Sequence, residues 1–257
     1  MRINYTDWAV ATSIRLNIGT YCALCARSAM PRIDLCGSCH QWLKSRRHMD
    51  SQGIGTTLCL GCGRKQVGQY SASVEQDYCG DCALEQGSSL RRIVAPYQYV
   101  YPFNELIKRI KYRQDRQLAR VLGTLLAQAV LHDTTDVLPE ILLPMPLHPD
   151  RLQQRGFNQA RDIAMWCGKR LDLPVPASQV SRIVDTGSLA GLNRQERRLR
   201  ILGAFRACDA LAGRRVAIVD DVLTTGASAR ELAREIYDSG AESVELWVLA
   251  RTSSNRD

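Results

Sequence analysis

The amino-acid sequence predicts an α/β chain in which a parallel sheet flanked by helices, over residues 90–257, follows a small cysteine-rich zinc-binding region over residues 1–89. Two observations predict this class. Eight of the ten cysteines lie before residue 90, and apolar strand patterns that alternate with helical patterns begin after it. The 257 residues are enough for one large domain or two modest ones, and the composition changes near Ser88.

The cysteines of the first region form four C-x-x-C pairs, which are Cys22/Cys25, Cys36/Cys39, Cys59/Cys62 and Cys79/Cys82. Two such pairs supply the four thiolates of one tetrahedral Zn2+ site. Residues 1–12 contain no apolar export segment, so a reducing cytoplasm favours metal thiolates over disulfides or redox dithiols. We expect one or two structural Zn2+ ions that bind sequential pairs; a cross-brace of alternate pairs is the other arrangement.

The overall composition is that of a chain that buries a core. Hydrophobic residues make up 45% and charged residues 23%, which excludes a low-complexity disordered chain. No apolar run reaches the roughly 18 residues of a membrane helix, so we expect no membrane span and a cytoplasmic location. The net charge is +8, and 29 of the 34 basic residues are arginine. Arginine suits bidentate contact with phosphate, although a basic surface is as often a solubility feature.

The second region is expected to alternate strands and helices. Strands are predicted over 92–100, 140–145, 215–219 and 243–250, and helices over 104–111, 114–131, 158–171, 193–200 and 226–239. Apolar strands that are each followed by a helix indicate a parallel sheet covered on both faces. Ligands of such sheets bind at the carboxyl ends of the strands.

Residues 216–228 read VAIVDDVLTTGAS and combine an apolar strand, two acids and a turn that opens a helix. A helix N-terminus offers unpaired N–H groups and a positive dipole end to a phosphate. The two carboxylates, Asp220 and Asp221, would repel a polyanion unless they accept hydrogen bonds from sugar hydroxyls or face Mg2+. The alternative is an ordinary strand–turn–helix with acidic surface residues.

This stretch resembles the phosphoribosyl pyrophosphate (PRPP) signature of the type I phosphoribosyltransferases, with Ser228 where threonine is commoner. The resemblance implies that Asp220 and Asp221 are the catalytic pair that holds the ribose 2′- and 3′-hydroxyls. It also implies that PRPP binds together with Mg2+. The residues implied to hold the 5′-phosphate are Thr224, Thr225, Gly226, Ala227 and Ser228.

A second cluster follows the predicted strand 140–145. In phosphoribosyltransferases the turn after this strand binds pyrophosphate through backbone N–H groups, and the resemblance places Pro146 and Leu147 in that turn and assigns them to PRPP. Arg151 and Arg155 are placed in sequence to neutralise the charge of the ligand, and Lys111 adds a cation from an earlier helix. The alternative is that the two arginines are i, i+4 neighbours on an exposed helix face.

The chain as a whole is similar to the ComF family of competence and DNA-utilisation proteins, which includes ComFC-like and GntX-like members. The motifs that carry the similarity are the C-x-x-C pairs, Lys111-Tyr-Arg, Pro144-Met-Pro-Leu, Arg155-Gly-Phe-Asn-Gln, Gly203-Ala-Phe and the PRPP signature. Residues 186–205 depart from the family, which usually has Gln near Leu189 and Asn near Arg200. The resemblance implies an amidophosphoribosyltransferase-like fold and a role with internalised single-stranded DNA. It further implies DNA-uptake helicase or channel proteins as partners, at the periphery of the inner membrane.

Two functions follow from these expectations. The first is a protein that binds PRPP and single-stranded DNA in natural transformation or DNA utilisation. The basic run from Arg194 to Arg200 favours nucleic acid, and Trp8, Trp42, Tyr97 and Tyr99 are candidates for base stacking. The second is an active phosphoribosyltransferase in nucleotide or salvage metabolism with no DNA role, whose acceptor the sequence does not identify.

Overall fold

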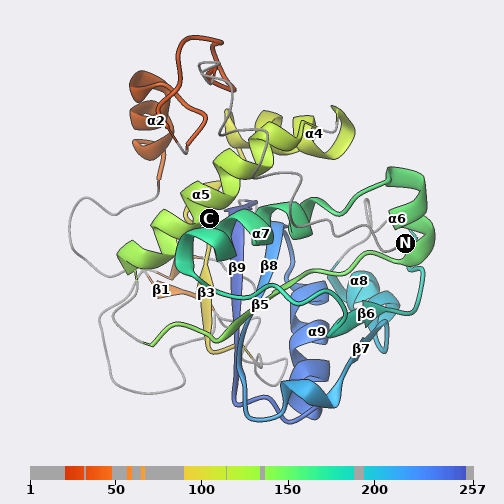
Figure 1. The fold of residues 1–257 in the computed structure, drawn as a ribbon. Helices are drawn as coiled ribbons and strands as arrows, with labels where there is room; N and C mark the ends of the chain where they lie inside the picture. The colour runs from red at the N-terminus through yellow and green to blue at the C-terminus, as the bar shows by residue number, and fades with distance from the viewer. Residues whose placement is uncertain are drawn as a thin grey trace, which may run out of the picture.

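A computed structural model of the chain describes residues 21–31, 33–47, 57–59, 65–66, 90–113, 115–133, 137–187 and 194–252. Its centre is a five-stranded sheet in the order β3-β9-β8-β5, with β4 also paired to β9 (Figure 1). The strands are β3 (Arg92–Val94), β4 (Tyr97–Gln98), β5 (Ile141–Pro144), β8 (Arg215–Leu223) and β9 (Ser243–Arg251). Every pairing in this sheet is parallel, which confirms the predicted fold class.

The two central strands, β8 and β9, are buried on both faces. Val216 and Ile218 face one hydrophobic cluster, whereas Ala217 and Val219 face another. This alternation is the two-residue period of a strand between two helical layers. The prediction that both faces of the sheet are covered is therefore confirmed.

Among the described elements, helices cover both faces of the sheet. The first cluster contains apolar residues of α4 (Phe103–Arg113), α5 (Arg116–Asp133) and α7 (Gln159–Leu171), and the second those of α9 (Ala227–Asp238). The helices α5 and α7 approach closely at Gly123, where an added Cβ would lie 2.6 Å from the carbonyl oxygen of Ile163. These four helices lie within three residues of their predicted bounds.

Two sequence predictions need correction. The strand expected over 92–100 is two short strands, β3 and β4, because the chain leaves the ladder at residues 95–96. The strand expected to end at Val219 continues to Leu223, since Asp220 and Val222 still pair with β9. The two carboxylates thus belong to the last four residues of β8 and do not follow the strand.

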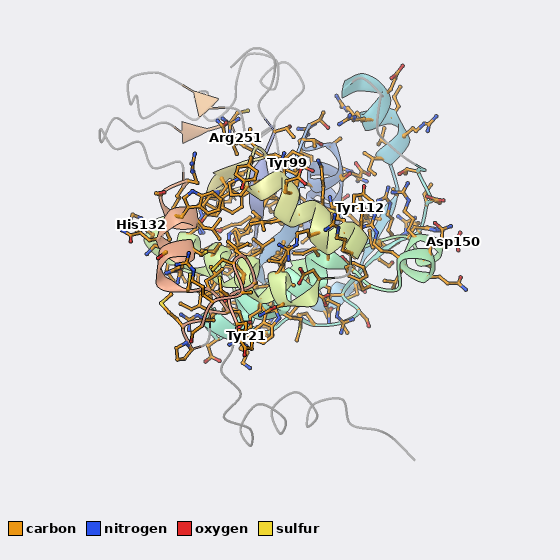
Figure 2. The ribbon with its side chains drawn as sticks, turned by 90° about the horizontal axis from the view of Figure 1, so that it is seen from above. Tyr21, Tyr99, Tyr112, His132, Asp150 and Arg251 are labelled. Carbon is orange, nitrogen blue, oxygen red and sulfur yellow. The ribbon has the colours of Figure 1, made fainter. Side chains whose placement is uncertain are left out.

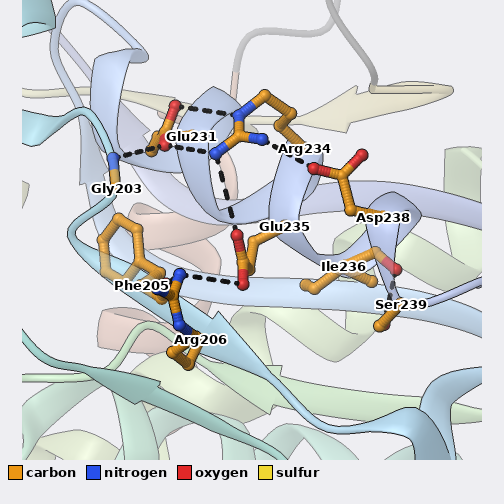
Figure 3. Close-up of polar contacts among 9 residues, drawn as sticks. All are labelled: Gly203, Phe205, Arg206, Glu231, Arg234, Glu235, Ile236, Asp238 and Ser239. Atoms are coloured by element: carbon orange, nitrogen blue, oxygen red, sulfur yellow. Dashed lines mark hydrogen bonds and ion pairs between the residues drawn. The ribbon is translucent and has the colours of Figure 1, made fainter.

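The strands β6 (Val180–Arg182) and β7 (Phe205–Ala207) form a separate two-stranded antiparallel sheet, here called the hairpin. It packs beside α9 together with α8 (Arg194–Ile201), which lies in the connection between the two strands (Figure 1). Figure 3 shows the polar contacts that attach it. Glu231 on α9 accepts a hydrogen bond of 2.8 Å from the backbone N–H of Gly203, and Arg206 pairs with Glu235 at 3.5 Å. The hairpin is therefore tied to the helix whose N-terminus follows the two acids.

The described part of the first region packs on the main core. It contains α2 (Gly37–Lys44) and the antiparallel strands β1 (Thr57–Leu58) and β2 (Lys65–Gln66). Leu35 and Leu43 are fully buried in the cluster formed by α4, α5 and α7, and Asp34 pairs with Arg120 of α5 at 3.3 Å. The division at residues 89 and 90 stays a prediction. No helix in the described part of the chain is long and apolar enough to cross a membrane.

Candidate functional site

A cleft of about 430 Å3 lies beyond the carboxyl ends of β5 and β8. It is lined by all twelve residues that the PRPP resemblance singles out, namely Lys111, Pro146, Leu147, Arg151, Arg155, Asp220, Asp221, Thr224, Thr225, Gly226, Ala227 and Ser228. These residues come from four separate segments of the chain. The fold therefore brings the two predicted clusters to one place, at the strand ends where ligands of open α/β sheets bind.

The turn between β8 and α9 has the backbone of an anion-binding loop. Gly226 begins the helix in the left-handed region, with φ of +75°, a conformation that glycine adopts without a steric cost. The N-cap residue Gly226 makes no side-chain hydrogen bond to the first N–H groups of α9, and the first two residues of the helix, Ala227 and Ser228, line the cleft. Arg230 supports the turn from behind by donating to the carbonyl oxygen of Thr225 over 3.1 Å.

The two carboxylates differ in their surroundings. Asp221 is 4% exposed, and its Oδ2 lies 2.5 Å from Nζ of Lys111, so α4 and β8 are joined by an ion pair. Asp220 has no cation at ion-pair distance among the described residues, and its Oδ1 accepts the backbone N–H of Asp221 over 2.8 Å. Burial and the charge of Asp221 raise the pKa of Asp220 well above its usual range, although Lys111 opposes this shift.

Lys111 itself is held in its charged form. Burial alone would lower its pKa, but the carboxylates of Asp221 and Asp220 outweigh burial and raise the pKa of the ammonium group. The sequence assigned Lys111 to the ligand directly. In this structure it lines the cleft while paired with Asp221.

The loop after β5 is shaped by the Arg155-Gly-Phe-Asn-Gln motif. Gly156 ends α6 (Pro149–Arg155) with φ of +76°. The side-chain oxygen of Asn158 accepts the N–H groups that begin α7, and its amide donates to the carbonyl oxygen of Met145 over 3.0 Å. Arg155 donates to the side chain of Gln159 over 2.8 Å. The motif thus fixes the 145–148 loop and aims Arg155 at the cleft.

Eleven further residues line the cleft without having been assigned to it, and five of them have polar side chains: Tyr99, Gln159, Arg182, Arg197 and Thr252. Arg197 donates to Oγ1 of Thr224 at 3.5 Å, so part of the basic run assigned to DNA faces the cleft instead. Arg182 belongs to no recognised sequence motif, and it lines the cleft because it is the last residue of β6. Five basic side chains and two carboxylates now line the cleft, a formal excess of three positive charges.

The aromatic candidates for base stacking separate into buried and accessible rings. Tyr97 is 1% exposed and stacks on Phe103 with ring centroids 3.8 Å apart, so it is a core residue and cannot stack on a base. Tyr99 lies at the cleft beside α4 (Figure 2). Trp42 meets the exposed ring of Tyr101 edge to face, with centroids 6.0 Å apart. Trp8 lies outside the described residues.

A cluster of four cysteines forms in the first region. The sulfur atoms of Cys22, Cys25, Cys36 and Cys39 all lie within 4.8 Å of one another. Burial opposes ionisation of Cys22, but hydrogen bonds from the backbone of Cys36, Leu24 and Cys25 lower its pKa to about 6. Thiolates stabilised by backbone N–H groups are the donors that tetrahedral Zn2+ requires, so the site fits a zinc ribbon with sequential pairing.

The other cysteines are described less completely. Cys59 is buried, whereas its predicted partners Cys62, Cys79 and Cys82 lie outside the described residues. Burial raises the pKa of Cys167 to about 12, so that thiol is inert. A second zinc site therefore stays a prediction.

Comparison with curated proteins finds relatives over most of the chain. Competence protein F of Haemophilus influenzae is 32% identical over 225 residues, which cover 84% of this chain and 90% of that protein. DNA utilization protein YhgH of Escherichia coli K12 is 32% identical over 76% of this chain and 85% of its own length. Competence protein ComFC of Bacillus subtilis is 26% identical over 86% of both. No protein-family model matches the chain.

Comparison with solved structures finds partial overlaps. A glutamine PRPP amidotransferase from B. subtilis, complexed with ADP and GMP, overlaps 49% of this chain at 19% identity and a TM-score of 0.34. The chain spans a quarter of the length of that enzyme. The protein TT1426 from Thermus thermophilus overlaps 53% of this chain and 84% of its own, at 18% identity and a TM-score of 0.30.

Proposed function

Because the chain belongs to the ComF family of competence and DNA-utilisation proteins, we propose that it binds PRPP in the cleft at β8 and acts with single-stranded DNA in DNA uptake or utilisation. The observation that supports PRPP is the cleft itself. A carboxylate pair, an uncapped helix N-terminus and an arginine-bordered loop line one cavity with an excess of positive charge. PRPP carries the matching groups, a diol between two phosphorylated ends.

Each part of the cleft suits one part of PRPP. The N–H groups at the start of α9 and the hydroxyls of Thr225 and Ser228 suit the 5′-phosphate. The carboxylate of Asp220 suits the ribose hydroxyls, which donate hydrogen bonds to it. The loop at Pro146 and Leu147, with Arg151 beside it, suits the pyrophosphate.

The donor set also fits Mg2+. Because Oδ2 of Asp221 faces Lys111, Asp220 is the carboxylate left for a metal that enters with PRPP. Carboxylate oxygens together with ligand phosphates are the usual environment of Mg2+. When bound, the ion neutralises part of the pyrophosphate charge.

A thermal-shift experiment tests PRPP binding. A ligand that binds only the native state raises the melting temperature, so PRPP with Mg2+ should stabilise the wild type. Asp220→Asn should lose most of that shift. The matched control is Asp172→Asn, since Asp172 is exposed at the far end of α7 in a left-handed conformation that Asn also tolerates. Equal shifts for Asp220→Asn and the wild type would refute the assignment.

The family names and the basic surface support the DNA role. On α8 the side chains of Arg198 and Arg200 are exposed, and the net charge is +8. Single-stranded DNA bound through such groups should dissociate steeply as salt rises. The test is fluorescence anisotropy of a labelled oligonucleotide over a salt series, with Arg198→Gln/Arg200→Gln and, as control, Arg170→Gln on α7. Absence of binding at low salt, or an affinity that does not change with salt concentration, would refute DNA binding.

A second candidate function is phosphoribosyl transfer without a DNA role. The arginines around the 145–148 loop would stabilise a departing pyrophosphate while an acceptor forms the new bond to ribose C1 and loses a proton. The assay is release of pyrophosphate from PRPP in the presence of nucleobases, ammonia or DNA ends. Release with one acceptor supports transfer, and none with any of them refutes it.

A further inference from the structure

Arg182 is a buried cation at the wall between two cavities. It is 8% exposed, at the end of β6, and its Nε has no hydrogen-bond partner. It lines the cleft at β8 and also a second cavity of about 470 Å3. The two cavities share Arg182 with Pro146 and Leu147, so the second cavity lies against the loop that the PRPP proposal assigns to pyrophosphate.

The contacts of Arg182 are with neutral groups. Its Nη2 donates to the hydroxyl of Thr186, and its guanidinium lies 5.7 Å from the ring centroid of Phe205, its cross-strand neighbour. Among the described residues no carboxylate lies at ion-pair distance from it. Asp185, which is close in sequence, pairs with Arg151 at 3.7 Å instead.

A purely structural role does not explain this arrangement. A buried charge is costly unless it is paired, and an apolar side chain of similar volume is often neutral or stabilising in its place. Burial and the charge of Arg151 lower the pKa of Arg182 by more than the charges of Asp185 and Asp220 raise it, yet a guanidinium remains charged in proteins. A buried cation kept at such a cost, in the wall of two cavities, is typical of a binding group whose counter-charge is a ligand.

We propose that Arg182 binds an anionic phosphoryl group through its guanidinium group at the junction of the two cavities. The inference deepens the proposed PRPP function. The phosphoryl group belongs either to the pyrophosphate end of PRPP in the cleft or to a phosphomonoester in the second cavity. The guanidinium is a binding residue in both cases, because it would touch the ligand.

The first experiment compares Arg182→Met with the wild type in thermal shift and calorimetry. The free variant should melt at or above the temperature of the wild type, because a buried unpaired charge is removed. Its affinity for magnesium pyrophosphate should fall about tenfold or more, the loss expected for one charged hydrogen bond. Its response to ribose 5-phosphate, which lacks the pyrophosphate, should be unchanged. Arg170→Met, at an exposed position of α7, is the control.

The second experiment observes Arg182 in the wild type and does not depend on the folding of the methionine variant. The Nε–H signal of Arg182, assigned by its absence in Arg182→Lys, should shift on addition of pyrophosphate as the guanidinium group gains an anionic acceptor. AMP is then added to protein saturated with PRPP and Mg2+. A further shift of that signal places the phosphoryl group in the second cavity, whereas a shift with pyrophosphate alone places it in the cleft.

The outcomes separate this inference from the proposed function. An Nε–H signal of Arg182 that shifts with neither pyrophosphate nor AMP would overturn the inference. An Arg182→Met variant that is less stable than the wild type, yet binds pyrophosphate with wild-type affinity, would overturn it as well. If the wild type responds to neither PRPP nor ribose 5-phosphate, PRPP binding is wrong. The response to pyrophosphate would still test Arg182 in that case.

Discussion

Nζ of Lys111 lies 2.5 Å from Oδ2 of Asp221, so the last turn of α4 is joined to the end of the central strand β8 by one ion pair. The side chain of Asp221 is 6% exposed and that of Lys111 is 23% exposed. A carboxylate so deeply buried is tolerated because its cation is present. The pair thus joins two elements that line the cleft.

Removal of Lys111 should unfold the protein more easily. Lys111→Met leaves the buried carboxylate of Asp221 without a cation, and we expect the free energy of unfolding in urea to fall by about 3 kcal/mol. The matched control is Lys108→Met on the same helix. Lys108 is half exposed and pairs with Glu105, so its loss should cost far less than that of Lys111. Equal effects of the two substitutions would contradict the pairing.

The same pair predicts a pH dependence. Because the pKa of Lys111 is raised in the folded protein, its contribution is fully present below the unfolded value of about 10.4 and is lost as the pH rises through the folded value. The difference in stability between wild type and Lys111→Met should therefore shrink above about pH 10.4. A difference that stays constant into that range would show that Lys111 acts through packing alone.

Asn158 predicts a separation of stability from binding. Asn158→Ala removes both the cap of α7 and the hydrogen bond to Met145, so it should cost about 1 kcal/mol and weaken pyrophosphate binding. Asn158→Asp keeps the capping oxygen and loses only the amide donor, so its stability in urea should stay near that of the wild type while its affinity falls. If calorimetry finds that Asn158→Asp binds pyrophosphate with wild-type affinity, the 145–148 loop does not depend on the hydrogen bond from Asn158 to Met145.

Residues of the candidate site that are neighbours in the chain can be recognised from the sequence. The strand, the two acids and the turn at Gly226 are recognisable because they are contiguous, and the fold brings them to the loop after β5. Two features of the site could not be predicted from the sequence. The Lys111–Asp221 pair depends on how α4 packs against β8, and Arg182 reaches the cleft only because a short hairpin packs on α9. Both depend on tertiary contacts that no local pattern encodes.

Glu231 holds the hairpin to α9 (Figure 3), and its removal should loosen that attachment. The carboxylate is 9% exposed, accepts the N–H of Gly203 and pairs with Arg234 at 2.8 Å. Glu231→Gln keeps an acceptor but loses the charge, so we expect a loss of about 1–2 kcal/mol in urea unfolding at pH 7. Glu105→Gln, at an exposed position of α4, should cost far less.

At acid pH the protein should lose the stability that the ionised carboxylate of Glu231 contributes. Burial alone would raise its pKa, but the hydrogen bonds from Arg234 and Gly203 lower it below the usual range. Its contribution is therefore present above the unfolded value of about 4.3 and is lost as the pH falls through the folded value. Wild type and Glu231→Gln should converge in stability below about pH 4.3. Parallel pH profiles would count against an ionised Glu231.

Zinc in the four-cysteine cluster should hold residues 21–47 on α5. Cys25 is exposed, so Cys25→Ser removes one thiolate without opening a cavity in the core. Elemental analysis should then find about one Zn2+ per chain fewer than in the wild type, and the melting temperature should fall because the metal supplies folding energy to this segment. Cys208→Ser, outside the C-x-x-C pairs, is the control. An unchanged zinc content in Cys25→Ser would show that the cluster is not a metal site.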